Sequence, residues 1–208
     1  MQKIAVFGES GHAQDIASVI NANASETQIE LVGEVDEAKS VEKLVIDGFR
    51  FIIGIGDNKI RKKIAERYAA IPWTTVISSG AHVPSSAVIE NGVFVGFGVY
   101  LSYNVHVKEH SIVHCNSVIG HDTKLEAFSQ ICPGVCIGGN GVTVGEGALI
   151  GTNATILNKR LTIGAWSKVS LASVVTNDIQ PGHLHQTVNK KVVLRLPFQL
   201  DHPGQSEV

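Results

Sequence analysis

An aliphatic residue recurs at every sixth position over about 90 residues of this 208-residue chain. The series is unbroken from Val83 to Ile137. It resumes one residue late at Val144 and again at Ile163, and it ends at Val175. A spacing of six fits neither the 3.6-residue turn of a helix nor the two-residue alternation of a flat strand. It fits a parallel β-solenoid, in which three sides of six residues close one coil and stacked coils share an apolar core.

Eighteen residues per coil predict about five coils in residues 79–180, which we interpret as one β-helical domain. Glycine often follows the aliphatic residue, as expected where the chain turns a corner between two sides. The two slips of the series, at 140–142 and 159–161, predict small bulges or loops at corners. The period ends after Val175, so residues 181–208 are expected to form a tail that covers the open edge of the last coil.

Residues 1–78 follow a different pattern, in which short apolar strands alternate with segments of helical spacing. Such alternation predicts a small parallel sheet covered by helices, which is a Rossmann-like α/β domain. The expected fold class is therefore a small α/β domain followed by a parallel β-helix. The expected strands are 3–8, 29–36, 50–58 and 73–78, and the expected helices are 12–22 and 59–70.

The loops after the first three strands of this domain carry candidate contacts to a nucleotide. The first strand turns through "GESGHA" into a helix, whose first amides can face a phosphate. An aspartate ends the second strand, a usual place to contact a nucleoside, and polar residues after the third strand face the same crevice. The full GxGxxG pattern is missing, so NAD is not expected. The candidate substrate-binding residues are Ser10, Gly11, His12, Asp36, Asn58 and Lys59.

Composition excludes several other classes. The formal net charge is −2 without a basic run, so nucleic acid is not an expected partner. No apolar run approaches a membrane span, and the N-terminus resembles a strand rather than a signal peptide, so we expect a cytoplasmic protein without a membrane partner. The three cysteines have no CxxC spacing. His106, His110 and His114 lie four apart but fall at different points of a six-residue repeat, so no metal site is expected.

The stretch "SVIGHDTKLEAF" (117–128) carries the candidate catalytic pair, His121 and Asp122. His121 is the second residue after the inward Ile119, so it falls toward a corner on the outside of the solenoid. An adjacent carboxylate can orient an imidazole and stabilise its charged form, and a histidine base suits proton removal near neutral pH. By spacing alone, a His–Asp pair is more often ordinary surface chemistry.

The chain resembles the bacterial sugar acetyltransferases that join a Rossmann-like domain to a left-handed β-helix. Motifs in the same order carry the resemblance over nearly the whole chain: "FGESGHA" (7–13), "GEVDE" (33–37), "IGIGDNKIRKKI" (53–64), "HVPSSAVIENGVFV" (82–95) and "SVIGHDTKLEAFSQICPGVCIGGN" (117–140). Members N-acetylate nucleotide-linked amino sugars, and a sister branch O-acetylates sialic acid. The resemblance implies a left-handed β-helix, acetyl-CoA as co-substrate, no metal, and a homotrimer with sites between subunits.

The resemblance also implies roles for individual residues. His121 matches the family's general base and Asp122 its acidic support, while Gly139 matches a backbone contact that can stabilise the oxyanion. Many members have a second histidine where this chain has Gln130, and a glycine-rich stretch is replaced here by "SLAS" (170–173). The expected contacts to acetyl-CoA are Gln130, Gly139, Gly151, Thr152 and Ala172.

Alternatives remain open at this point. The first expectation is N-acetylation of the amino group of a nucleotide-linked amino sugar, a surface-glycan precursor, by direct transfer from acetyl-CoA. The nearby alternative is O-acetylation of sialic acid or a related sugar, and a further one is a non-catalytic sugar-nucleotide binder. Solenoids of this shape also include metal-dependent carbonic anhydrases, but that interpretation does not explain the N-terminal domain. His12 contacts substrate or only caps its helix.

Overall fold

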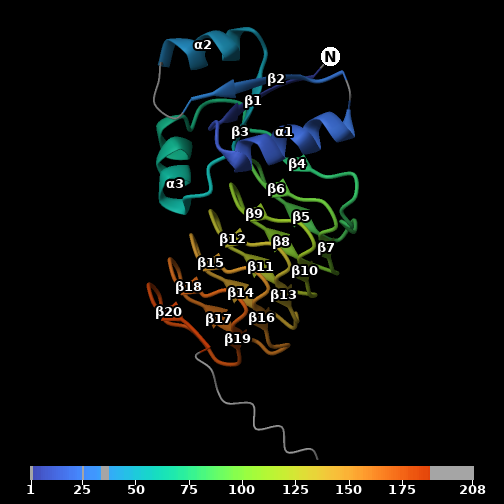
Figure 1. Cartoon of the computed structure of the whole chain (residues 1–208), viewed down its shortest axis with the longest axis vertical. Helices are drawn as coiled ribbons and strands as arrows, with labels where there is room; N and C mark the ends of the chain where they lie inside the picture. The colour runs from blue at the N-terminus through green and yellow to red at the C-terminus, as the bar shows by residue number, and fades with distance from the viewer. Residues whose placement is uncertain (1, 25, 34–37, 188–208) are drawn as a thin grey trace, which may run out of the picture.

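The computed structural model of the protein describes residues 2–24, 26–33 and 38–187 (Figure 1). An N-terminal α/β unit covers one end of a parallel β-helix, and the later coils extend away from that unit. The fold class expected from the sequence is confirmed.

The N-terminal unit is a three-stranded parallel sheet in the order β2–β1–β3. On β1, Ile4 and Val6 pack with α1 on one face of the sheet, whereas Ala5 and Phe7 pack with α2 and α3 on the other. Within the described residues, no helix is both long enough and apolar enough to cross a bilayer. The strands are β1 (Lys3–Phe7), β2 (Gln28–Val32) and β3 (Arg50–Ile53), and the helices are α1 (Gly11–Asn23), α2 (Ala38–Ile46) and α3 (Asn58–Arg67).

The β-helix has three flat sides, each a parallel sheet of two-residue strands. The first side holds β7 (Tyr100–Leu101), β10 (Val118–Ile119), β13 (Cys136–Ile137), β16 (Thr155–Ile156) and β19 (Val174–Val175). The second side holds β5 (Val88–Ile89), β8 (His106–Val107), β11 (Lys124–Leu125), β14 (Thr143–Val144) and β17 (Thr162–Ile163). The third side holds β4 (Val76–Ile77), β6 (Phe94–Val95), β9 (Ile112–Val113), β12 (Gln130–Ile131), β15 (Leu149–Ile150), β18 (Lys168–Val169) and β20 (Leu184–His185).

The aliphatic residues of the six-residue series form the core of the β-helix. From Val95 to Val175 every member of the series is buried, and the earlier Val83 and Ile89 are partly buried against the same core. Ile119 pairs with Ile137, which is 18 residues later, as the period predicts. Apolar burial along this continuous column is the main stabilising contribution to the solenoid.

The two slips of the series lie at corners, as expected. Leu125 pairs with Val144, which is 19 residues later, so the second of these coils holds one extra residue. The extra residue lies in a turn in which Gly139, Asn140 and Gly141 all have positive φ. Glycine and asparagine adopt this left-handed conformation at low cost, so the insertion leaves the core register intact.

Two segments differ from the expectation. Of the strand expected at 73–78, Trp73 forms only a single bridge to Phe51, and β4 pairs with β6 of the β-helix because the chain crosses there from one sheet to the other. At the other end, Ile179 bridges to Ile163 and β20 pairs with β18, so the solenoid has about six turns rather than about five. The boundaries at residues 78 and 180 remain an interpretation, and strand pairing in the β-helix runs from Val76 to His185.

Arg61 of α3 joins the N-terminal unit to the β-helix. Its side chain is almost fully buried, and Nε donates to the carbonyl of His110 (2.8 Å) while Nη2 donates to that of Phe128 (2.7 Å). Nη1 donates to the carbonyl of Ile55 (2.9 Å) within the N-terminal unit. Burial lowers the pKa of Arg61 to about 9. The guanidinium is therefore held by main-chain carbonyls of both parts, which fixes α3 against the coils that carry the candidate site.

Candidate active site

The three corners of the β-helix separate the candidate residues, and each is named here for one residue. The His121 corner joins the first side to the second, and the Trp166 corner joins the second side to the third. The Thr152 corner joins the third side to the first. In the order of the chain, the first side therefore lies between the Thr152 corner and the His121 corner.

His121 and Asp122 form a hydrogen-bonded pair at the His121 corner. Nδ1 of His121 lies 2.8 Å from Oδ2 of Asp122, and both side chains are close to half exposed. Nδ2 of Asn104, one coil earlier, donates to Oδ1 of Asp122 at 2.8 Å. The hydrogen bonds from Asn104 and then His121 lower the pKa of Asp122, so this carboxylate is ionised and accepts the Nδ1 proton. The Nε2 lone pair of His121 then points away from Asp122 and is available as a base.

The next coil brings Gly139 against His121. Gly139 has φ +91°, and a Cβ atom placed there would lie 2.7 Å from the amide nitrogen of His121. Gly120 makes an equally close approach to Gly138. The main chains of the two coils therefore pass each other closely beside the catalytic pair, which only glycine allows. The sequence-based grouping of His121, Asp122 and Gly139 is thus reproduced in space.

Asn104 was not singled out from the sequence. It lies 18 residues before Asp122, which is the coil spacing, and the amide of Asp122 donates to the carbonyl of the preceding Tyr103. Stacking each candidate on the residue 18 positions away would have found it.

Gly151, Thr152 and Ala172 come together at the Thr152 corner. The amide of Ala172 donates to the carbonyl of Thr152 at 2.8 Å, and a Cβ atom on Gly151 would lie 2.6 Å from the amide nitrogen of Leu171. Ala172 takes the left-handed conformation, with φ 52°, that glycine or asparagine more often adopts. Within one chain, this group is separated from His121 by the first side of the β-helix.

Gln130 lies on β12, the strand that leads into the Thr152 corner, beneath α1. It is 8% exposed, and its Nε2 lies 3.5 Å from Nε2 of His114. The ring of His12 lies 4.9 Å from that of His114. Both ring nitrogens of His12 and the Oε1 atom of Gln130 are buried without a hydrogen-bond partner in the described structure. The resulting polar cluster is poised to accept ligand groups, and His114 is a member that the sequence did not suggest for this role.

Burial and neighbouring charge keep the two histidines of this cluster neutral. Desolvation, followed by the nearby His114 and Arg61, lowers the pKa of His12 to about 3. Desolvation also lowers the pKa of His114. Neutral imidazoles offer one donor and one acceptor each, which suits uncharged partners such as hydroxyl or carbonyl groups.

The residues at the start of α1 leave main-chain donors open. Ser10 is the N-cap residue with φ −73° and ψ 177°, and its side chain makes no capping hydrogen bond. A Cβ atom on Gly11 would meet no atom within 4 Å, so the helix start is accessible from that direction. The first amides of a helix lack intrahelical partners and carry partial positive charge, so this end can hold an anion.

The start of α3 is more restricted. Nδ2 of Asn58 donates to the carbonyl of Gly147 (3.0 Å), and its Oδ1 accepts from Arg61 Nη2 (3.1 Å). The Asn58 side chain is therefore engaged within the protein, whereas Lys59 is exposed. Oδ1 of Asp57 caps the helix by accepting from the amides of Lys59 and Ile60. Asp36 lies outside the described residues.

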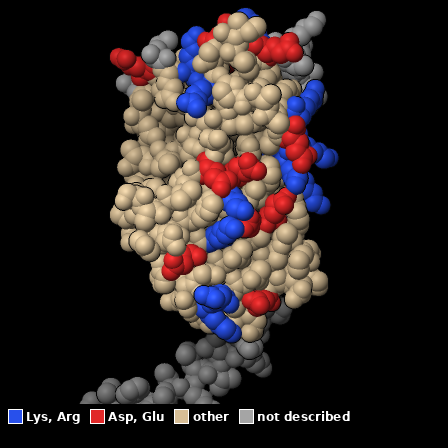
Figure 2. Space-filling view, turned by 180° about the vertical axis from the view of Figure 1, so that it is seen from behind, with Lys and Arg blue, Asp and Glu red and all other residues tan. Residues whose placement is uncertain are grey.

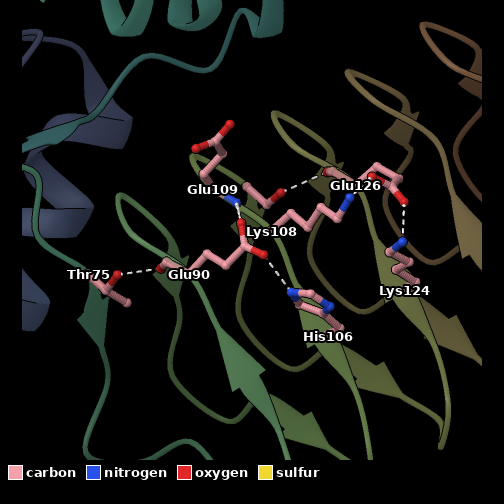
Figure 3. A network of polar contacts seen from close by, with 8 residues as sticks. Thr75, Glu90, His106, Lys108, Glu109, Lys124 and Glu126 are labelled. Atoms are coloured by element: carbon pink, nitrogen blue, oxygen red, sulfur yellow. Dashed lines mark hydrogen bonds and ion pairs between the residues drawn. The ribbon is translucent and has the colours of Figure 1, made fainter. Parts of the chain in front are cut away.

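The second side of the β-helix carries a network of charged pairs rather than a site (Figure 3). His106 Nε2 lies 2.6 Å from Glu90 Oε1, and Lys108 Nζ lies 2.6 Å from Glu126 Oε2. Lys124 pairs with Glu126 as well. In Figure 2, acidic and basic side chains alternate across the face in view, and neither sign covers a large area.

The histidines spaced four apart occupy different places, as expected from the repeat. His106 lies on the second side, His110 at the Trp166 corner and His114 next to the Thr152 corner. No group of three or more histidine, cysteine, aspartate or glutamate side chains that could hold a metal ion occurs within the described residues.

Comparison with known proteins adds a consistent set of relatives. Residues 3–68 match the family described as the PglD N-terminal domain. UDP-N-acetylbacillosamine N-acetyltransferase of Bacillus subtilis is 30% identical over 113 residues, which are 46% of this chain and 51% of that protein. The match therefore spans about half the length of this curated relative.

Solved structures match over both parts of the chain. A mutant of GDP-perosamine N-acetyl transferase from Caulobacter crescentus, in complex with CoA and GDP-perosamine, has a TM-score of 0.80 and 27% identity over 88% of this chain and 93% of that one. The acetyltransferase domain of PglB from Neisseria gonorrhoeae, in complex with acetyl coenzyme A, has a TM-score of 0.80 and 26% identity over 88% and 95%. The chain therefore belongs to the hexapeptide-repeat acetyltransferases that join a PglD-type N-terminal domain to a left-handed β-helix.

Proposed function

We propose that the protein transfers the acetyl group of acetyl-CoA to the amino group of a nucleotide-linked amino sugar, with His121 as the general base. The observation that carries this proposal is the chain of hydrogen bonds from Asn104 through Asp122 to Nδ1 of His121. The chain fixes one tautomer and one orientation of a half-exposed imidazole. The named substrates and CoA complexes of the relatives support the choice of acceptor and donor.

The geometry favours direct transfer. Nε2 of His121 takes a proton from the sugar amine as the nitrogen attacks the thioester carbon, and Asp122 stabilises the imidazolium that forms. The amide of Gly139, beside His121, donates to the oxyanion of the tetrahedral intermediate. The intermediate collapses when the C–S bond breaks, and the CoA thiolate leaves and takes up a proton.

A homotrimer completes the site. Gln130, Gly151, Thr152 and Ala172, the expected contacts to acetyl-CoA, gather near the Thr152 corner, whereas the base lies at the His121 corner. The first side between these corners exposes apolar side chains: Tyr100 is 46% exposed, Val118 42% and Val174 51%. Three copies that face these sides toward a common axis bring the Thr152 corner of one copy next to the His121 corner of its neighbour.

The N-terminal unit holds the nucleotide portion of the acceptor. The open amides at Gly11 and His12 contact phosphate, Lys59 approaches from the start of α3, and Asp36 contacts the nucleoside. We place the reaction in the cytoplasm, without a nucleic-acid or membrane partner, because both co-substrates are soluble metabolites.

Release of free CoA thiol tests the proposal. Wild type and His121→Ala are compared with acetyl-CoA and a panel of nucleotide-linked 3-amino and 4-amino sugars and sialic acids. Turnover of one amino sugar that falls about 10²- to 10⁴-fold in the variant is the expected result. Turnover of sialic acids alone indicates O-acetylation instead. Failure to bind either acetyl-CoA or any nucleotide sugar contradicts the enzymatic function.

A further inference from the structure

The largest described cavity lies at neither of the two corners that the proposed chemistry uses. It has a volume of about 600 Å³ and lies between the start of α3 and the Trp166 corner. Its walls include Lys59 from the N-terminal unit, and Trp166 and Lys168 from the β-helix. This volume is in the usual range for small-molecule sites, roughly 300–1,000 Å³.

The side chain of Trp166 is placed by the coil geometry. Trp166 has φ 58°, and a Cβ atom on Gly147, in the coil before it, would collide with the indole ring. The indole therefore lies against the bare main chain of Gly147. The same ring also lines the adjoining pocket, which Lys59, Lys62 and Lys63 share.

The Trp166 corner lacks an aromatic partner for this indole. In earlier coils, His110 and Phe128 occupy the same corner position and stack with ring centroids 5.4 Å apart and an interplanar angle of 8°. The equivalent positions on either side of Trp166 are Gly147 and Gly182, and a Cβ atom on Gly182 would meet nothing within 4 Å. Within the described chain, Trp166 forms no ring–ring contact, so space for a planar group remains beside it.

The charges that line the cavity favour an anion. Lys59 and Lys168 are exposed, and neither forms an ion pair in the described part of the chain. The carboxylate of Asp57 is occupied by the amides at the start of α3. Glu146, on the same corner, is paired with Lys62 at 2.6 Å. The two free ammonium groups are thus left facing a cavity that also offers an aromatic face.

We propose that this cavity binds the nucleoside diphosphate of the acceptor, with the base stacked on Trp166 and the phosphates paired with Lys59 and Lys168. A planar base and a multiply charged diphosphate match the two kinds of group on its walls. The proposal rests on the proposed function for the sugar that this nucleotide carries. It assigns part of the nucleotide contact to the β-helix, through Trp166 and Lys168, and not to the N-terminal loops alone.

Tryptophan fluorescence provides a direct measurement, because the chain has two tryptophans. In the Trp73→Phe variant, Trp166 is the only emitter. Titration of the acetyl-CoA-free protein with UDP, GDP, dTDP and CDP is expected to quench it saturably for at least one nucleotide. CoA, whose adenosine end shares this chemistry, is titrated separately. Quenching by CoA alone, or by none of these compounds, overturns the proposal.

Calorimetric titration of the quenching nucleotide then tests the two β-helix residues in the wild-type background. Trp166→Leu and Lys168→Gln are each expected to weaken binding by about tenfold or more. Lys124→Gln, an outward lysine on β11 of the second side, is the matched control and leaves the affinity unchanged. Equal affinity in wild type, Trp166→Leu and Lys168→Gln overturns the proposal even if acetyl transfer is established. Nucleotide binding that depends on Trp166 sustains it even if no acetyl transfer is found.

Discussion

The Nδ1 atom of His121 lies 2.8 Å from Oδ2 of Asp122, although the two residues are sequence neighbours on a tight corner. Asp122 reaches this position with φ 59°, in the left-handed region. Its carboxylate is at the same time held by Asn104 of the preceding coil. A substitution at position 122 therefore alters a charge, a hydrogen bond and a backbone preference together, and a useful test has to separate them.

Asp122→Asn removes the charge and retains the backbone preference, because asparagine adopts the left-handed region readily. A hydrogen bond to a charged group contributes roughly 1.5–3 kcal/mol. We therefore expect kcat/KM to fall about 10- to 100-fold, since 1.4 kcal/mol corresponds to a factor of ten. The free energy of unfolding is expected to change by less than about 0.5 kcal/mol. Steady-state kinetics and urea unfolding measure both, and an unchanged kcat/KM contradicts a supporting role for Asp122.

Gly139→Ala is expected to disturb the site through its neighbour. Both Gly139 and Gly141 have positive φ, +91° and +81°, so alanine at either position adds strain of about 1–2 kcal/mol. Only at Gly139 does the new Cβ atom also approach the amide nitrogen of His121, at 2.7 Å. At Gly141 the nearest atom is Nε of Arg160, at 3.6 Å.

Gly141→Ala is therefore the matched control. It is expected to lower the free energy of unfolding by about 1 kcal/mol and to leave kcat/KM near the wild-type value. Gly139→Ala is expected to be less stable than this control and also less active, because the backbone of His121 has to shift. Equal effects of the two variants on activity contradict the close contact between the coils.

The core of the β-helix could be predicted from the sequence because each coil repeats one simple requirement. An inward aliphatic residue every six positions is visible in any single chain, and Ile119 and Leu125 lie where the period places them. The pair of His121 and Asp122 could be found because its members are adjacent. The Asn104 contact could not be found by that route, since it depends on the stacking of coils 18 residues apart.

Contacts between the two parts of the chain were also out of reach of periodicity. Arg61 was part of an apparently solvated basic run, yet it is buried and hydrogen-bonded to carbonyls of His110 and Phe128. A helical pattern shows which face is apolar but not that a cation on it finds carbonyls from another domain. Trp166 is a similar case, because its setting depends on glycines in neighbouring coils.

Arg61→Met is expected to separate the two parts energetically. Methionine fills much of the volume but leaves several buried carbonyls without a donor, and each such group costs about 1–3 kcal/mol. We expect a loss of about 3 kcal/mol or more in the free energy of unfolding. Amide hydrogen exchange is expected to accelerate in α3. Arg67→Met, on the exposed end of the same helix, should change stability by less than about 0.5 kcal/mol. Similar losses in both variants contradict the joining role of Arg61.

Acid is expected to destabilise the protein through its buried histidines. Desolvation is the main cause that lowers the pKa of His12 to about 3 and that of His110 to about 4. In the unfolded chain these histidines titrate near 6.5, so below that pH the unfolded state binds more protons than the folded state. Stability is therefore fully present above pH 6.5 and is lost as the pH falls toward 4 and then 3.

Between pH 7.5 and pH 5, each of the two histidines lowers the free energy of unfolding by about 2 kcal/mol. His110→Phe removes one of these contributions, and Phe128 shows that phenylalanine is accepted at the same corner position with φ 60°. Urea unfolding at both pH values should therefore give a smaller pH-dependent loss in His110→Phe than in wild type, by about 2 kcal/mol. A wild-type stability that does not change over this range contradicts neutral burial of both rings.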